Sequence, residues 1–203
     1  MRPADLTATL RRHYRGLLAI GDRFDPVCFV IHPASGRPVM AVAADALTQE
    51  AVTLHVPDDS GTQSVHLLGR PAVVDPARDP AADRFLVYHG TPRTRCWLAI
   101  DPESAKSADG VLGADEIDLT NTLHSAEPAL CRALNADPGR LSALCRAAAA
   151  GTAPSDPRAV GVDPQGVDIR ASFGIIRVEF RDPIASEHDL GLACEAFLHG
   201  DRP

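Results

Sequence analysis

Hydrophobic and polar residues alternate most regularly near the end of the chain. Residues 167–172 and 176–181 each place an apolar side chain at every second position, a period that is typical of a half-buried β-strand. Turn-forming residues separate them, with Asp163-Pro164-Gln165-Gly166 before the first segment and Ser172-Phe173-Gly174 between the two. Together with the apolar run that begins at residue 159, this pattern predicts a three-stranded antiparallel meander.

Helical patterns lie on both sides of this meander. Residues 125–150 have helical periodicity, and Asp137-Pro138-Gly139 is expected to divide them into two helices. After the meander, Ser186 is a suitable N-cap, with Asp189 three residues later. The apolar residues that follow fall on one helical face: Leu190, Ala193, Cys194 and Phe197.

The first half of the chain predicts one helix followed by short strands. Residues 4–20 carry the apolar stripe of a helix that ends at Gly21-Asp22, with an arginine cluster (Arg11, Arg12 and Arg15) on a solvated face. We then expect strands at residues 27–31, 38–43, 52–56, 65–74 and 95–100, a helix at 81–89 and a loop at 101–113. Short strands separated by turn residues predict a small antiparallel barrel or sandwich.

Composition narrows the class of protein. Of 203 residues, 45% are hydrophobic and 23% are charged, which is ordinary for a globular protein. The formal net charge of −7 argues against a general electrostatic grip on nucleic acid. Because no apolar run approaches the length of a membrane span and no N-terminal signal pattern is present, we expect a soluble, cytoplasmic protein with no membrane partner.

Five cysteines are scattered through apolar runs, without a Cys-x-x-Cys pair that would indicate a zinc ribbon or a redox site. We expect them to act as small buried hydrophobic residues in a reducing compartment. They are Cys28, Cys96, Cys131, Cys145 and Cys194.

The meander and its helix resemble a known signature. Residues 159–184 read AVGVDPQGVDIRASFGIIRVEFRDPI, which resembles the C-terminal module of haem-utilisation proteins of the HugZ type: a G-[VI]-D-x-x-G-x-D-[LI]-R hairpin, then an R-[VI]-x-F-x-x-P-[VI] strand, then a helix. The matching positions are Gly161, Asp163, Gly166, Asp168, Ile169, Arg170, Arg177, Phe180, Pro183 and Ile184.

The resemblance implies an α+β protein with two domains. Residues 1–120 would form an antiparallel split β-barrel with an N-terminal helix, of the FMN-binding type found in pyridoxamine 5′-phosphate oxidase. Residues 121–203 would form a small C-terminal α+β module with helices, a three-stranded meander and a last helix. The family further implies a homodimer with ligand pockets between the barrels, and haem or FMN as the ligand.

Two departures from the family pattern bear on the ligand. The family helix of the form H-M-N-x-D-H reads Ala133-Leu134-Asn135-Ala136-Asp137-Pro138 here, without either histidine. The basic segment that holds the flavin phosphate is replaced by Pro57-Asp58-Asp59-Ser60-Gly61-Thr62-Gln63, with two acids and no base. Since a phosphate needs several cationic or N–H donors, FMN binding is disfavoured, although not excluded.

Candidate ligand-binding residues come from two places. Arg93, Arg95 and Trp97 occupy alternate positions at the start of the fifth expected strand, and a guanidinium pair beside an indole suits a carboxylate such as a haem propionate. His199 precedes a short tail, where the resemblance would place an axial haem-iron ligand. A basic strand face with an interface tryptophan, and a solvated terminal histidine, remain the alternatives.

The strand register also predicts a pair of facing histidines. If Leu54 and Val56 share the inner face of the barrel with the apolar residues of the next strand, His55 lies opposite His66 on the outer face. Such a pair suits a metal, but no third ligand is visible, and a surface or interface pair remains the alternative.

Catalytic motifs are absent from the sequence. It contains no Gly-x-Ser-x-Gly, His-Glu-x-x-His or Gly-x-x-x-x-Gly-Lys, and no catalytic residue is predicted. The favoured function is therefore a haem-associated or other small-ligand-binding protein that has lost FMN binding. The alternatives are an FMN-dependent oxidoreductase or haem-degrading enzyme, and a protein-interaction module without a ligand, as the same module in chloroplast glutamyl-tRNA-reductase-binding proteins suggests.

Overall fold

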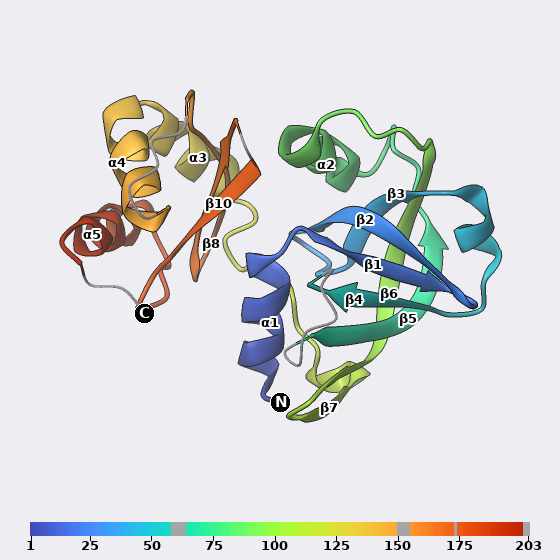
Figure 1. Cartoon of the computed structure of the whole chain (residues 1–203). Coiled ribbons are helices and arrows are strands. Elements are labelled where there is room, and N and C mark those ends of the chain that lie inside the picture. The colour runs from blue at the N-terminus through green and yellow to red at the C-terminus, as the bar shows by residue number, and fades with distance from the viewer. Residues whose placement is uncertain (58–63, 150–154, 173, 201–203) are drawn as a thin grey trace. The chain divides into compact units, whose positions relative to one another are not determined.

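The computed structural model describes residues 1–57, 64–149, 155–172 and 174–200. They divide into two compact units, Met1–Thr120 and Asn121–Pro203, which Figure 1 colours from blue to yellow and from yellow to red. The first unit is an antiparallel barrel and the second is a small α+β module, so the fold class predicted from the sequence is confirmed.

The first unit is a barrel of six strands with one added strand. Its sheet has the order β3-β2-β1-β4-β5-β6-β7, and β3 also pairs with β6, which closes the barrel. The helices α1 (Pro3–Arg12) and α2 (Pro80–His89) accompany it. The strands are β1 (Arg15–Ile20), β2 (Arg23–Ile31), β3 (Pro38–Val42), β4 (Val52–Val56), β5 (Val65–Val73), β6 (Cys96–Ser107) and β7 (Gly110–Gly113).

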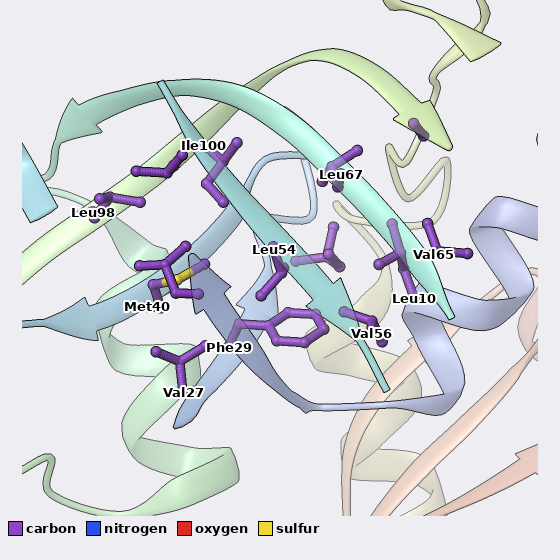
Figure 2. Close-up of a cluster of buried hydrophobic side chains, with 14 of the residues drawn as sticks. Leu10, Val27, Phe29, Met40, Leu54, Val56, Val65, Leu67, Leu98 and Ile100 are labelled. Carbon is purple, nitrogen blue, oxygen red and sulfur yellow. The ribbon is translucent and has the colours of Figure 1, made fainter. Parts of the chain in front are cut away.

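The barrel is filled by aliphatic side chains from alternate strand positions (Figure 2). Phe29 and Leu54 are fully buried at its centre, and Leu10 of α1 joins the same cluster. This alternation confirms the predicted strands at 52–56 and 65–74, and the nearly continuous burial of residues 27–31 confirms the run expected to be covered on both faces.

Two predictions for this unit are wrong. The helix expected over residues 4–20 ends at Arg12, and Arg15–Ile20 forms β1 instead. Because β1 pairs with both β2 and β4, tertiary pairing overrides the local helical pattern. The loop expected at 101–113 is also wrong, since β6 continues to Ser107 and pairs with β5 and then β7.

Arg11 corrects the expectation of a solvated arginine cluster. Its residue surface is only 6% exposed, and Nη2 donates hydrogen bonds to the carbonyl oxygens of Leu119 and Thr120 at 3.2 and 2.9 Å. Arg12 and Arg15 are exposed, as expected. Arg11 thus holds the end of the unit's chain against its first helix.

In the second unit, helices pack on a three-stranded sheet. Its sheet has the order β10-β9-β8, formed by β8 (Arg158–Asp163), β9 (Gly166–Ala171) and β10 (Gly174–Glu179), which confirms the meander. The helices are α3 (Glu127–Asn135), α4 (Pro138–Ala148) and α5 (Glu187–Leu198). The break at Asp137 is confirmed, as is the N-cap at Ser186, whose side chain accepts a hydrogen bond from the Asp189 amide.

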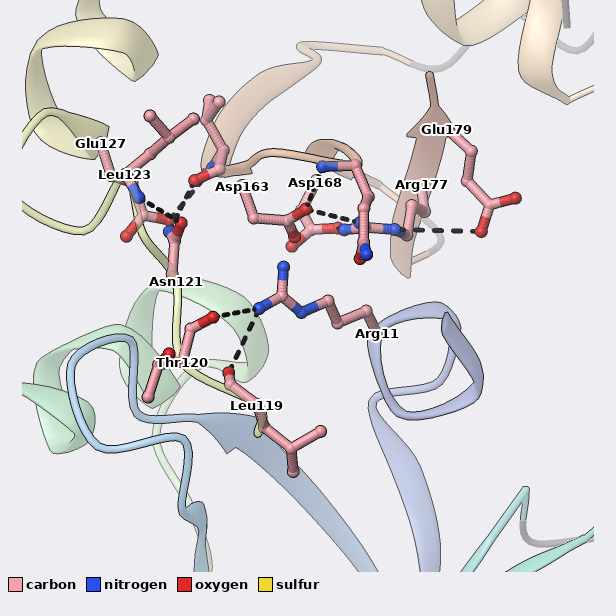
Figure 3. A network of polar contacts seen from close by, with 12 residues as sticks. Arg11, Leu119, Thr120, Asn121, Leu123, Glu127, Asp163, Asp168, Arg177 and Glu179 are labelled. Atoms are coloured by element: carbon pink, nitrogen blue, oxygen red, sulfur yellow. Dashed lines mark hydrogen bonds and ion pairs between the residues drawn. The ribbon is translucent and has the colours of Figure 1, made fainter. Parts of the chain in front are cut away.

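Three of the residues that carry the family resemblance, Asp163, Asp168 and Arg177, form a buried ion-pair cluster (Figure 3). Arg177 donates to Asp163 at 2.9 Å and to Asp168 at 3.0 Å, and its side chain is only 6% exposed. The sequence predicts Asp168 on a polar face, yet it is 3% exposed. Its burial is offset by the pairing with the guanidinium, because an unpaired buried charge is costly.

Gly166 shows why this signature requires glycine. A Cβ built there would lie 2.4 Å from the Val178 carbonyl oxygen and 3.3 Å from the guanidinium carbon of Arg177. Any larger residue would therefore separate β9 from β10 or displace the arginine. The signature thus specifies the packing of the meander.

We expect Arg177→Met to destabilise the second unit by about 3–5 kcal/mol, because it leaves two buried carboxylates without their partner. The measurement is urea unfolding followed by far-UV circular dichroism, with fluorescence of Trp97, the single tryptophan, as a separate report on the barrel. Arg70→Met removes an exposed pair with Glu103 and serves as the control, with an expected change of at most about 1 kcal/mol. Equal effects of the two variants would contradict the structural role of Arg177.

The cysteines differ in exposure more than the sequence suggests. Cys145 and Cys194 are buried, whereas Cys28, Cys96 and Cys131 are partly exposed, and all five are free thiols. Burial raises the pKa of both the Cys145 and the Cys194 thiol to about 11. Thiolates, which are the reactive form, are therefore scarce at these two positions.

We expect iodoacetamide at pH 8 to modify native Cys28, Cys96 and Cys131 before Cys145 and Cys194, which should react only on unfolding. Peptide mass spectrometry after timed labelling would check this order. Early modification of Cys194 in the folded protein would show that its surroundings open readily.

Candidate functional site

A cleft of about 500 Å³ lies in the barrel unit, within the range of about 300–1,000 Å³ that is typical of small-molecule sites. Its apolar walls include Leu18, Val27 and Phe85, from β1, β2 and α2. Its polar groups come from the end of α2 and from residues 91–94, which lead into β6. It therefore lies at the end of α2, beside the strands that close the barrel.

Helix α2 is fixed at both ends. At its start, the Asp79 side chain accepts a hydrogen bond from the Ala81 amide, and the Asp79 carboxylate lies 3.6 Å from His32 Nε2 in the turn between β2 and β3. At its end, Gly90 adopts a φ of 76°, and its amide donates to the Leu86 carbonyl. This conformation favours glycine, and it makes His89 the last residue of the helix.

His89 is the most constrained polar group of the cleft. Its Nε2 lies 2.9 Å from the Phe29 carbonyl oxygen, and since a carbonyl only accepts, Nε2 carries the proton. Burial lowers the pKa of His89, with a smaller contribution from Arg15, although the bond to Phe29 opposes the shift. The imidazole is therefore neutral at pH 7.

The second ring nitrogen of His89, Nδ1, then carries a lone pair. Among the described residues it has no hydrogen-bond partner. A histidine whose one nitrogen donates to a backbone carbonyl while the other is free has the arrangement of a metal-ligating imidazole. The hydrogen bond to Phe29 fixes both the tautomer and the ring orientation.

The charged and hydroxyl groups of the cleft suit an anionic group of modest size. Arg93 lines it together with Thr91 and Thr94, and Arg93 has no ion-pair partner in the part of the chain that the structure describes. Asp25 also lines the cleft, but it pairs with Arg23 at 2.8 Å. One free guanidinium with nearby hydroxyls matches a carboxylate.

The three residues predicted to bind a carboxylate, Arg93, Arg95 and Trp97, do not lie together at one site. Arg93 and Arg95 are both exposed, but only Arg93 lines the cleft. Trp97 is buried, with its ring 5.1 Å from that of Phe85. The expectation that the three share one strand face is wrong, because β6 begins only at Cys96.

His199 belongs to the second unit, where it is the exposed C-cap residue of α5. No group of three or more metal-ligating side chains occurs among the described residues. The acidic segment on which the loss of FMN binding was predicted, residues 58–63, lies outside the described residues.

The two retained residues of the altered family helix have structural partners. The Asn135 amide donates to the Ala159 carbonyl and accepts from the Ala159 amide, at 3.0 and 2.9 Å. Asp137 caps α4 by accepting from the Arg140 amide. Both residues therefore hold elements of the second unit together.

Sequence reasoning missed His89, although a signal existed. Phe85, Tyr88 and His89 are spaced so that they share one face of α2, which places a histidine beside the buried side of the helix. The hydrogen bond to Phe29 joins residues 60 positions apart, and no local pattern indicates it.

Comparison with known proteins supports the fold. The crystal structure of Atu2129, a protein of unknown function from Agrobacterium tumefaciens, is 20% identical, with a TM-score of 0.73 over 96% of this chain and 95% of that one. This likeness shows that the two chains share a fold over nearly their whole length, and at this identity it concerns the fold alone.

Other solved structures match more loosely. A heme binding protein from Mycobacterium smegmatis is 17% identical, with a TM-score of 0.44 over 98% of this chain and 97% of that one. A protein from Listeria innocua, provisionally assigned as a pyridoxamine 5′-phosphate oxidase, is 15% identical, with a TM-score of 0.38 over 51% of this chain and 93% of that one. No family model and no curated protein matches the chain. In the described part of the chain, every helix is too short or too polar to span a membrane.

The lowered pKa of His89 predicts a pH dependence of stability. The unfolded chain takes up a proton near pH 6.5, whereas folded His89 does so only at lower pH, so stability falls as the pH drops below about 6.5. We expect His89→Gln to lose less stability than the wild type between pH 7.5 and pH 5. Urea unfolding at both pH values checks this, and equal losses would contradict the assigned shift.

Proposed function

We propose that this protein binds a small molecule in the cleft beside α2, and that the ligand is haem or a similarly flat, largely apolar molecule with a carboxylate. The observation that carries the proposal is His89, which is held neutral by burial and oriented by the Phe29 carbonyl, and whose Nδ1 has no hydrogen-bond partner among the described residues. Arg93 and the apolar walls of the same cleft supply the other contacts such a ligand needs.

The residues of the cleft fit haem in chemical type. The imidazole of His89 suits the iron, the guanidinium of Arg93 suits a propionate, and Leu18, Val27 and Phe85 suit the apolar faces. When bound, haem would supply an iron centre, which the His89 imidazole would hold. The protein's contribution is to keep His89 unprotonated and correctly turned, and to shield the iron from water with apolar side chains.

FMN fits the same residues less well. Its phosphate carries up to two negative charges and needs several donors at one place, whereas the cleft offers one guanidinium and includes the carboxylate of Asp25. We therefore keep the loss of FMN binding as part of the proposal. An FMN-dependent oxidoreductase and a ligand-free interaction module are the outcomes that would replace it.

We expect purified protein to develop a Soret band when titrated with haemin, and His89→Ala to weaken haemin binding at least tenfold, because it removes the oriented imidazole. Arg93→Ala should weaken binding by roughly 3- to 10-fold, the effect of losing one charge-assisted contact. Visible absorption and fluorescence titration measure both.

The matched controls are His199→Ala and Arg95→Ala, which remove the residues proposed from the sequence that lie outside the cleft. Haemin affinity that falls in His199→Ala but not in His89→Ala would move the site to the second unit. A yellow protein with stoichiometric flavin would overturn the proposal in favour of the oxidoreductase. No spectral or thermal response to either ligand would favour the interaction module.

A homodimer, implied by the family resemblance, remains part of the proposal, as does the cytoplasmic location expected from the sequence. Light scattering coupled to size-exclusion chromatography distinguishes a chain of 21.5 kDa from its dimer.

A further inference from the structure

A second histidine arrangement lies on the outer face of the barrel, apart from the cleft. His55 on β4 is directly opposite His66 on β5, as the strand register predicted. Leu54 and Val56 on one strand and Val65 and Leu67 on the other are at most 2% exposed, because they fill the core. The two imidazoles therefore point outward, with their ring centroids 4.2 Å apart and their planes inclined by 50°.

Among the described residues, the neighbours of this pair engage only one of its ring nitrogens. On the β1 side, Leu17 lies opposite His55, and the ring of Phe24 meets that of His55 edge-on at 5.4 Å. On the other side, Lys106 lies opposite His66. One hydrogen bond engages the pair, between Ser64 Oγ and His66 Nε2 at 3.2 Å, and no described carboxylate binds either ring.

Burial lowers the pKa of His55, and the neighbouring His66 lowers it further, since two imidazolium ions so close together would repel each other. A neutral imidazole is the form that binds metal ions.

The distance between the two ring centroids favours one type of metal ion over another. With metal–nitrogen bonds of about 2.0–2.1 Å, two imidazoles at adjacent corners of a square have ring centroids roughly 4.5 Å apart, against roughly 5.2 Å in a tetrahedral site. The observed distance between the ring centroids, 4.2 Å, is shorter than both values and lies closer to that of the square arrangement. Square or tetragonal coordination by nitrogen and oxygen is characteristic of Cu²⁺ and Ni²⁺, whereas Zn²⁺ prefers a tetrahedron.

We propose that His55 and His66 form a two-imidazole site on the outer face of the barrel for a divalent transition-metal ion with tetragonal preference, Cu²⁺ or Ni²⁺ rather than Zn²⁺. Water fills the other coordination positions, because the described residues provide no third histidine, cysteine or carboxylate ligand. The site is consequently open and exchangeable, and it is independent of the cleft that contains His89.

The test uses the full chain and Ni²⁺, which does not oxidise the free thiols. Isothermal titration calorimetry should show one Ni²⁺ per chain, bound more tightly than Zn²⁺. His55→Gln and His66→Gln should each weaken binding at least tenfold, and the double variant should be little worse than either, because a chelate is lost when one arm is removed. His199→Ala is the matched control and should bind Ni²⁺ as the wild type does.

Equal Ni²⁺ affinity in His55→Gln and the wild type would overturn the proposal, and tighter Zn²⁺ binding would overturn the tetragonal geometry. A second measurement needs no variant: in the wild-type protein, substoichiometric Ni²⁺ should broaden the ring proton signals of His55 and His66 before those of the other histidines. Broadening that begins at His89 or at His199 would also overturn it. Since haemin binding is measured at His89, failure of either proposal leaves the other intact.

Discussion

The pairing of β3 with both β2 and β6 is the constraint on which the barrel and its cleft depend. Without the pairing of β3 with β6, the seven strands would form an open sheet with two long edges, and the aliphatic residues of its inner face would meet water. Closure also determines the path of the chain, because α2, which connects β5 to β6, has to cross the outside of the closing strands, and it packs on β2 and β3. The cleft beside His89 forms where this helix ends, so its position is a consequence of how the barrel closes.

The signature that identifies the second unit has a structural explanation. Arg177 reaches Asp163 and Asp168 across neighbouring strands, and Gly166 leaves the space that the arginine occupies. When a buried arginine pairs with two carboxylates, removing any one of the three strongly lowers the free energy of unfolding. This set of residues therefore specifies the packing of the meander. A resemblance based on it is strong support for a fold and weak support for a ligand. This is why the ligand proposal rests on the barrel unit, whose sequence match is the weaker of the two.

Most elements could be predicted because their causes are local. Alternation of apolar residues and turn-forming residues located β4, β5 and the meander, and the same period placed His55 opposite His66. The predictions fail where contacts with residues distant in the sequence determine the local structure. Leu17 and Leu18 fit a helical stripe, but β2 and β4 flank them and turn Arg15–Ile20 into a central strand. His89 was missed for the same reason, since its tautomer and orientation depend on a carbonyl of β2. The wrong grouping of Arg93, Arg95 and Trp97 has another cause. Alternate positions share a face only within a strand, and the strand begins at Cys96.

The histidines of the barrel unit show how the same side chain acquires different roles. His32 uses both nitrogens for structure, because Nδ1 accepts from the amides of Ala34 and Ser35 while Nε2 faces Asp79. His89 uses Nε2 for structure, in its hydrogen bond to the Phe29 carbonyl. Because this bond fixes the orientation of the ring, it also fixes the direction of Nδ1, which is suited to bind one ligand. Among the described residues, His55 has ring contacts alone and His66 adds one bond to Ser64, so their position is set mainly by strand pairing. The number of ring nitrogens that the fold itself engages therefore separates a structural histidine from one that is available to bind.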